Sequence, residues 1–208
     1  MHLKDWPREI FVTGTDTGIG KTVISAMLTK ALNAAYWKPI QAGLEEETDT
    51  EFVQRVTGLP TSQIKPERYR LKTPMSPHGA AEIDGVSIAL KDFVLPDYST
   101  DHLVVEGAGG LLVPVNDQDM IIDLIRYLEL PVVLVVRSTL GTLNHTFLSL
   151  EALRERDIPV LGVVMNGPRH QSNYEAIQHY GDIEVLAQIE ELKDVNPPTL
   201  QETFEQKF

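Results

Sequence analysis

The chain has 208 residues, 42% of them hydrophobic and none of them cysteine, and its formal net charge at pH 7 is −12. The lack of cysteine excludes disulfides, thiolate metal sites and a cysteine nucleophile. The acidic charge argues against DNA, RNA or an anionic membrane as a general partner. A polar N-terminal segment and apolar runs of only strand length predict a soluble, cytoplasmic protein with a single α/β domain over residues 1–208.

Short apolar runs alternate with segments of helical periodicity along the chain. Strands are predicted at residues 10–13, 35–40, 103–106, 132–136 and 160–165, and helices at 22–34, 48–57, 120–128, 142–156 and 172–180. Residues 60–77 are interpreted as a long connection, and residues 190–208 as a polar tail with little pattern. Because run 132–136 is apolar at every position, we expect a mostly parallel central sheet flanked by helices on both faces.

The first strand leads into a glycine-rich turn, Gly14 to Thr22, and then into a helix with an apolar stripe. Such a connection directs backbone N–H groups and a positive helix end at one point, which suits a phosphate chain. Lys21 would reach the β- and γ-phosphates, and Thr22 would place its hydroxyl on Mg²⁺. The spacing is a variant, with Thr15 at the position of the usual first glycine, and a simple connecting turn is the alternative. The predicted fold class is therefore the α/β phosphate-loop NTPase fold.

Charged side chains follow the next strands. Lys38 precedes Pro39, and its ammonium is expected in the same crevice as Lys21, where two lysines would suit a phosphoryl transition state. A solvated surface lysine is the alternative. Glu106 ends its strand before four small residues and is placed to complete a Mg²⁺ shell, unless it only caps a turn. Asp49 is either a second Mg²⁺ ligand or an N-cap or first-turn acid of its helix.

Two later turns are candidate ligand contacts. Asn166 follows the strand at 160–165 and could read an adenine edge, although the turn itself also favours asparagine. Residues 141–145 open a helix whose free N–H groups could bind a carboxylate, with Thr142 as an ordinary N-cap in the competing interpretation. The six histidines show no spacing typical of a metal site.

Taken in order, these motifs resemble those of the dethiobiotin synthetase family. The resemblance extends from about residue 10 to about residue 190 and rests on residues 12–17, 20–22, 38–39, 76–78, 105–110, 141–145 and 166. It implies an ATP-dependent ligase of biotin biosynthesis that requires Mg²⁺. In this family an amine of 7,8-diaminononanoate captures CO₂ as a carbamate, ATP phosphorylates the carbamate, and the second amine closes the ureido ring.

The resemblance also implies roles for individual residues. Lys21 and Lys38 would stabilise phosphoryl and carbamate oxygens, and Thr22, Asp49 and Glu106 would hold Mg²⁺. ATP would be bound by Thr17, Gly18, Ile19, Gly20, Lys21, Thr22 and Val23, by Gly107, Ala108 and Gly109, and by Asn166, Gly167, Glu190, Glu191 and Leu192. The diamine would contact Thr13, Lys38, Ala42 and Gly109, and in a homodimer its carboxylate would meet Leu143 and Asn144 across the interface.

Two positions depart from the family's pattern. Ala42 stands where a Ser or Thr usually lies near the carbamate, so a neutral hydrogen bond of about 1 kcal/mol is missing unless Gln41 or water replaces it. The family's Ile-Pro segment beside the nucleotide reads Ile189-Glu190 here. The alternative class is a dimeric ATPase switch of the partitioning or cell-division-placement type, but such proteins carry a lysine where this chain has Asp16.

Overall fold

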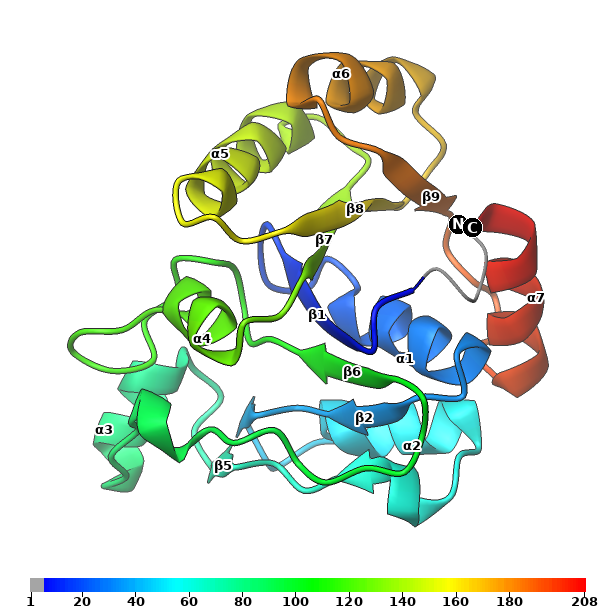
Figure 1. Ribbon diagram of the computed structural model, residues 1–208. Helices are drawn as coiled ribbons and strands as arrows, with labels where there is room; N and C mark the ends of the chain where they lie inside the picture. Colours follow the sequence, from blue (N-terminus) through cyan, green and yellow to red (C-terminus); the bar gives the residue numbers. More distant parts are fainter. Residues whose placement is uncertain (1–5) are drawn as a thin grey trace.

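Seven strands form one sheet in the order β4-β2-β6-β1-β7-β8-β9, and each neighbouring pair is parallel (Figure 1). The computed structural model describes residues 6–208. The strands of this sheet are β1 (Glu9–Gly14), β2 (Ala35–Trp37), β4 (Ile64–Lys65), β6 (Leu103–Glu106), β7 (Val132–Arg137), β8 (Val160–Asn166) and β9 (Val185–Ile189). Two further strands, β3 (Ile40–Ala42) and β5 (Tyr69–Leu71), form a separate parallel pair.

Helices cover both faces of the large sheet (Figure 1). One face is covered by α1 (Lys21–Ala31), α2 (Asp49–Thr57) and α7 (Pro197–Lys207), and the other by α4 (Ile121–Leu128), α5 (Thr142–Arg154) and α6 (Gln171–Gly181). α3 (Pro77–Asp84) packs against the small sheet, and η2 (Thr61–Gln63) and η3 (Leu90–Asp92) are 3₁₀-helices. The predicted α/β class is confirmed. None of the helices in residues 6–208 is long and apolar enough to cross a membrane.

Neighbouring residues of each central strand face opposite layers. On β1, Phe11 belongs to the core that includes α4 and α5, whereas Ile10 and Val12 belong to the core that includes α1 and α7. On β7, all residues from 132 to 136 are buried. This explains the run without polar positions, because a strand covered on both faces has no side open to water.

The predicted strand at 35–40 is wrong in one respect, since it is two strands in two sheets. β2 ends at Trp37 and β3 begins at Ile40. Between them Pro39 has no N–H to donate, and its carbonyl accepts hydrogen bonds from the backbone N–H groups of Arg68 and Tyr69. The chain therefore leaves the large sheet at Lys38, at its carboxyl edge.

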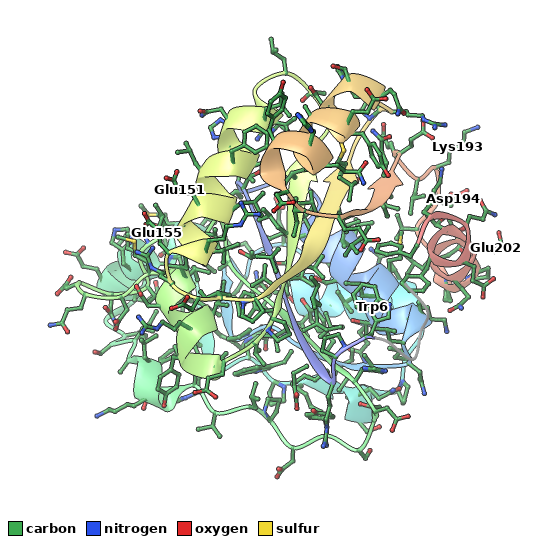
Figure 2. All side chains as sticks on the ribbon, turned by 45° about the horizontal axis from the view of Figure 1, so that its top comes forward. Trp6, Glu151, Glu155, Lys193, Asp194 and Glu202 are labelled. Atoms are coloured by element: carbon green, nitrogen blue, oxygen red, sulfur yellow. The ribbon has the colours of Figure 1, made fainter. Side chains whose placement is uncertain are left out.

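The interpretation of residues 190–208 as a patternless tail is also wrong. They include α7, whose N-cap Asn196 accepts a hydrogen bond from the backbone N–H of Thr199. Phe204 on this helix packs against Trp6, with ring centroids 6.2 Å apart. Figure 2 shows Trp6 beside α1 and the exposed Glu202 on the outside of α7. The segment at 60–77 likewise contains β4 and β5 rather than only a connection.

Candidate functional site

The glycine-rich turn connects the end of β1 at Gly14 to the start of α1 at Lys21. Gly20 is the N-cap residue of α1 and has a φ of 91°. A Cβ atom on Gly20 would lie 2.2 Å from Nδ2 of Asn166, so glycine is required both by the backbone and by the neighbour. No side chain caps α1, which leaves the first backbone N–H groups of the helix suited to an anion.

Asp16 organises the first half of this turn. Its backbone carbonyl accepts a hydrogen bond from Nζ of Lys21 at 2.8 Å. Its carboxylate accepts one from the backbone N–H of Thr17 at 2.7 Å and another from Nη2 of Arg137 at 2.6 Å. Arg137 is the last residue of β7, so the turn is held by a side chain from the neighbouring strand.

Four side chains from separate elements converge beside the turn. The hydroxyl of Thr22 donates to Oδ1 of Asp49 and to Oε1 of Glu106, at 2.9 Å in each case. Nζ of Lys38 lies 2.6 Å from Oδ2 of Asp49 and 3.1 Å from Oε1 of Glu106. One hydroxyl, two carboxylates and one ammonium thus form a single connected network.

The sequence places each member of the network close to the carboxyl end of a strand or in the first turn of a helix. Glu106 is the last residue of β6, and Lys38 follows the last residue of β2, its neighbour in the sheet. Asp49 is the first residue of α2, after the N-cap Thr48. Asp49 is therefore a first-turn acid of α2. It also accepts a hydrogen bond from Thr22, another predicted Mg²⁺ ligand, and its own role as a Mg²⁺ ligand stays a prediction.

Burial and the neighbouring charges set the ionisation of the network. Burial alone would lower the pKa of Lys38, but the carboxylates of Glu106 and Asp49 outweigh it and raise that pKa above its ordinary value. Burial lowers the pKa of Lys21, and the nearby charge of Lys38 lowers it further. For Asp49, burial is opposed by Lys38, and the pKa is lowered. Lys38 is thus held as a cation and Asp49 as an anion.

A cavity of about 780 Å³ lies over this network. Lys21 and Lys38 both line it, as predicted, together with Thr17, Gly18, Gly20, Thr22, Val23, Ala42, Asp49, Glu106, Ala108 and Gly109. Lys38 is only 4% exposed, so the interpretation as a solvated surface lysine is wrong. Part of the wall comes from the segment from Pro74 to Pro77, which includes the start of α3.

Small residues after β6 let the chain turn closely over the strand ends. A Cβ atom on Gly107 would lie 2.7 Å from Cε1 of Phe11, and Gly109 has a φ of 66°. Ala108 and Gly109 line the cavity, whereas Gly107 and the predicted diamine contact Thr13 do not. Thr13 is fully buried, and its hydroxyl has no hydrogen-bond partner within residues 6–208.

The residues predicted at the adenine lie together at the ends of β8 and β9. Asn166 and Ile189 are paired across these strands, and the backbone N–H of Gly167 donates to the carbonyl of Ile189 at 2.8 Å. Nδ2 of Asn166 donates to the carbonyl of Ile19 at 2.8 Å and so ties β8 to the glycine-rich turn. The strand pairing brings this group next to Glu190, Glu191 and Leu192, none of which lines the cavity.

The predicted carboxylate contacts lie at the start of α5. Its N-cap is Gly141, with a φ of 91°, so the interpretation of Thr142 as the N-cap is wrong. Thr142 is buried, and its hydroxyl lies 3.4 Å from that of Thr146. Leu143 packs partly against the core and Asn144 is exposed, and neither lines the cavity of its own chain.

Ala42 lines the cavity without a polar side chain, and the amide of its neighbour Gln41 is engaged elsewhere. Nε2 of Gln41 donates to the carbonyl of Ala42 at 3.2 Å and to that of Gly43 at 3.3 Å. Oε1 of Gln41 accepts from the backbone N–H of Asp49 at 3.3 Å. Gln41 therefore connects β3 to the start of α2 and helps to place Asp49.

The site also contains residues that were not predicted from the sequence, and two of them contact the predicted residues directly. Arg137 contacts the turn through Asp16, as described above. Tyr36 is fully buried on β2, and its hydroxyl donates to Oε2 of Glu106 at 2.9 Å. A signal for Tyr36 was present, because a phenol in an otherwise apolar buried strand requires a polar partner.

Comparisons with known proteins identify the family. A family model described as an AAA domain matches residues 8–199. The ATP-dependent dethiobiotin synthetase BioD of Brucella ovis is 50% identical to this chain over 199 residues, which cover 96% of the chain and 93% of the relative. The chain belongs to the dethiobiotin synthetase family. A second dethiobiotin synthetase, from Brucella abortus strain S19, is 49% identical over the same coverage.

Solved structures share the fold at much lower identity. A ParA family ATPase from Chlorobium tepidum TLS has a TM-score of 0.52 at 12% identity, with 96% of this chain and 90% of that chain covered. The MinD cell division protein of Aquifex aeolicus has a TM-score of 0.54 at 15% identity, with 95% and 91% covered. At this low identity, the likeness to these proteins shows that the chain has the phosphate-loop fold and shows nothing of its function. Membership of the dethiobiotin synthetase family makes the chain an ATP-dependent ligase of biotin synthesis, as the motifs predicted.

Proposed function

We propose that this chain joins CO₂ to 7,8-diaminononanoate at the expense of ATP and closes the ureido ring of dethiobiotin. The observation that carries the proposal is the convergence of Lys21, Lys38, Thr22, Asp49 and Glu106 on one cavity, in a chain that is 50% identical to a dethiobiotin synthetase. A pair of lysines suits the anions of this reaction, because both a carbamate and a transferring phosphoryl group carry their charge on oxygens.

The donor set beside the turn fits Mg²⁺. Mg²⁺ is usually held by one or two carboxylates, together with waters and substrate phosphates. Thr22, Asp49 and Glu106 provide a hydroxyl and two carboxylates that are already joined by hydrogen bonds of 2.9 Å. These residues would hold the ion, and when bound it supplies positive charge next to the phosphate oxygens. Within residues 6–208 no group of three or more His, Cys, Asp or Glu side chains suggests another metal site.

The reaction has three balanced steps. An amine nitrogen bonds to the carbon of CO₂ and loses a proton, which gives a carbamate anion. A carbamate oxygen then bonds to the γ-phosphorus as the bond to ADP breaks. The second amine bonds to the carbonyl carbon and loses a proton, and inorganic phosphate leaves.

The protein groups act on these steps by position and charge. Lys38, whose raised pKa keeps it cationic, would stabilise the carbamate and the transferring oxygens. Lys21 would exchange the carbonyl of Asp16 for phosphate oxygens. The uncapped N-terminus of α1 would bind the phosphates through backbone N–H groups, together with residues 17–23.

The remaining contacts complete the proposal. Ala108 and Gly109 would face the nucleotide with Gly107 next to them, and the diamine would contact Ala42. The hydroxyl of Thr13 has no partner within residues 6–208, and the diamine would have to displace the neighbours that bury it to make the predicted contact. Oδ1 of Asn166 accepts no hydrogen bond within residues 6–208 and could accept one from the amino group of adenine, with Gly167 and residues 190–192 beside the base. Leu143 and Asn144 lie outside the cavity of their own chain, and in a homodimer they would contact the diamine bound by the second subunit.

The test is ATP consumption by the purified chain with Mg²⁺ and bicarbonate, with and without 7,8-diaminononanoate, and detection of dethiobiotin by mass. ADP formation that requires the diamine and yields the product is expected. Lys38→Ala should abolish product formation, whereas Lys193→Ala, which changes an exposed lysine on the connection before α7, should not. ATP hydrolysis indifferent to the diamine would overturn the proposal and favour a switch ATPase.

A further inference from the structure

We propose that Tyr36 is a positioning residue that fixes the carboxylate of Glu106, so that only one of its two oxygens is presented to Thr22 and Lys38. In assigning Glu106 to the metal, this inference rests on the proposed function. Tyr36 does not line the cavity, and it would act only through Glu106.

The two oxygens of Glu106 have different partners. Oε2 accepts the hydroxyl of Tyr36 at 2.9 Å. Oε1 accepts Thr22 at 2.9 Å and Nζ of Lys38 at 3.1 Å. A glutamate carboxylate otherwise rotates broadly about its last side-chain bond, with two equivalent oxygens. The phenol therefore restricts this freedom and makes Oε1 the oxygen that faces Thr22 and Lys38.

The sheet holds the phenol in place. β2 and β6 are paired, with Tyr36 opposite Val104 and Trp37 opposite Val105. Tyr36 and Glu106 are 0% and 1% exposed, so the hydrogen bond between them is shielded from bulk water. A carboxylate left with one unsatisfied oxygen in such an interior would rotate or move to find another donor.

The phenol of Tyr36, which donates to Glu106, is neutral, and a neutral donor suits a position next to a candidate Mg²⁺ site. Burial, followed by the charge of Glu106, raises the pKa of Tyr36 well above its ordinary value, so the phenol keeps its proton. An arginine or lysine at the same position would add positive charge and weaken the attraction of Glu106 for a metal ion. The phenol orients the carboxylate and leaves its negative charge uncompensated on that side.

The same chain contains a matched pair away from the site. The hydroxyl of Tyr69 on β5 donates to Oδ2 of Asp92 at 2.6 Å, and Tyr69 is 7% exposed. Neither residue lines the cavity. Tyr69→Phe therefore removes a phenol-to-carboxylate hydrogen bond of the same kind without touching the candidate metal ligands.

The experiment compares the wild-type chain, Tyr36→Phe and Tyr69→Phe. Thermal stabilisation by ADP is measured first in EDTA and then with increasing MgCl₂. Groups that orient metal ligands typically contribute about 10- to 100-fold to metal affinity. For Tyr36→Phe we expect the Mg²⁺ concentration at half-maximal stabilisation to rise about tenfold, with ADP binding in EDTA unchanged. Tyr69→Phe should match the wild type in both measurements.

A second variant guards against a general loss of folding. Tyr36→4-aminophenylalanine keeps the ring and an N–H donor at the same place, and it should restore the Mg²⁺ dependence of the wild type. Equal Mg²⁺ dependence in Tyr36→Phe and the wild type would overturn the inference. So would a parallel loss of ADP binding in EDTA, because that result means a structural role.

The result is separable from the proposed function. A wild-type chain that binds ADP with Mg²⁺ but makes no dethiobiotin would refute the reaction and leave the role of Tyr36 intact. A wild-type chain that makes dethiobiotin, with Tyr36→Phe unchanged in Mg²⁺ dependence, would refute the role of Tyr36 alone.

Discussion

The ammonium group of Lys38 lies 2.6 Å from the carboxylate of Asp49, and the same nitrogen lies 3.1 Å from Glu106. These two carboxylates are the candidate Mg²⁺ ligands, and the side chain of Lys38 is only 5% exposed. The lysine therefore supplies the positive charge that a divalent ion would otherwise supply. We expect Lys38 and Mg²⁺ to compete for the same negative charge.

We expect Lys38→Met to lower turnover and at the same time to strengthen Mg²⁺ binding. Loss of a group that stabilises the transition state should lower kcat by about 100-fold or more. Because the buried carboxylate of Glu106 and the partly buried carboxylate of Asp49 lose their counter-ion, the Mg²⁺ concentration that gives half-maximal thermal stabilisation should fall, by about tenfold, in line with the effect of a close opposite charge. Titration of the variant and the wild type with MgCl₂ measures the shift.

The control for this titration is Lys193→Met, because Lys193 is exposed on the connection between β9 and α7 (Figure 2). It should leave both kcat and the Mg²⁺ titration unchanged. Mg²⁺ binding that weakens when Lys38 is replaced would contradict competition between the lysine and the ion.

Gly20→Ala tests the geometry of the turn. An alanine at a φ of 91° is strained by about 1 to 3 kcal/mol, and its Cβ would lie 2.2 Å from Nδ2 of Asn166. Asn166 must then release the carbonyl of Ile19, so the turn loses its tie to β8. We expect ADP affinity to fall by at least about tenfold, which corresponds to 1.4 kcal/mol, when measured by calorimetry.

The matched control is Gly85→Ala at the end of α3. Gly85 has a φ of 66°, and a Cβ there would meet nothing within 4 Å. This variant carries similar backbone strain at a place outside the cavity, so its stability should fall while its ADP affinity stays the same. Equal ADP affinity in Gly20→Ala and the wild type would refute the requirement for glycine at the N-cap.

Much of the site could be predicted because its residues stand at strand ends. The strand at 103–106 was predicted with the bounds that β6 has, and Glu106 ends it. Parallel strands bring their carboxyl ends to one edge, so the order of the motifs predicted that Lys21, Lys38 and Glu106 would meet. Local sequence patterns were sufficient for these residues, because the parallel sheet brings the ends of its strands together.

Contacts between distant residues could not be predicted in this way. Arg137 pairs with Asp16 across 121 residues, and Tyr36 bonds to Glu106 across 70 residues. An apolar strand pattern indicates that both faces are covered but not which polar side chain meets which partner. α7 was missed although Asn196 and the buried Leu200 and Phe204 have helical spacing, because two prolines and mostly polar residues lie between them and leave only a short apolar stripe.

Arg137→Ala tests the support of the turn from β7. The side chains of Arg137 and Asp16 are 42% and 59% exposed. Exposed ion pairs of this kind contribute about 0 to 1 kcal/mol to stability. We therefore expect the ATP affinity of Arg137→Ala to fall only about two- to fivefold, because a fivefold change corresponds to about 1 kcal/mol. The difference from the wild type should shrink in high salt, because salt screens exposed charges.

Arg70→Ala provides the comparison, since Arg70 forms an ion pair with Glu67 at 3.0 Å outside the cavity. Its ATP affinity should equal that of the wild type at every salt concentration. A loss for Arg137→Ala that is as large in high salt as in low salt would mean that Arg137 acts by something other than its charge.

Glu51→Gln tests whether a charged capping group holds the start of α2, where Asp49 lies. The carboxylate of Glu51 accepts the backbone N–H of Thr48 at 2.8 Å and its hydroxyl at 2.9 Å, and these bonds lower the pKa of Glu51. The unfolded value is about 4.3. The charged form therefore adds stability that is complete above that value and is lost as the pH falls through the lower folded value.

Urea unfolding from about pH 7 to about pH 3, on either side of the unfolded pKa, measures this contribution. The midpoint of the wild type should exceed that of Glu51→Gln at neutral pH, and the two should converge in acid, where both side chains are neutral. Glu155→Gln is the control, because Glu155 is exposed at the end of α5 and its carboxylate makes no hydrogen bond within residues 6–208. A gap between wild type and Glu51→Gln that stays constant over the whole range would show that the charge of Glu51 has no part in capping α2.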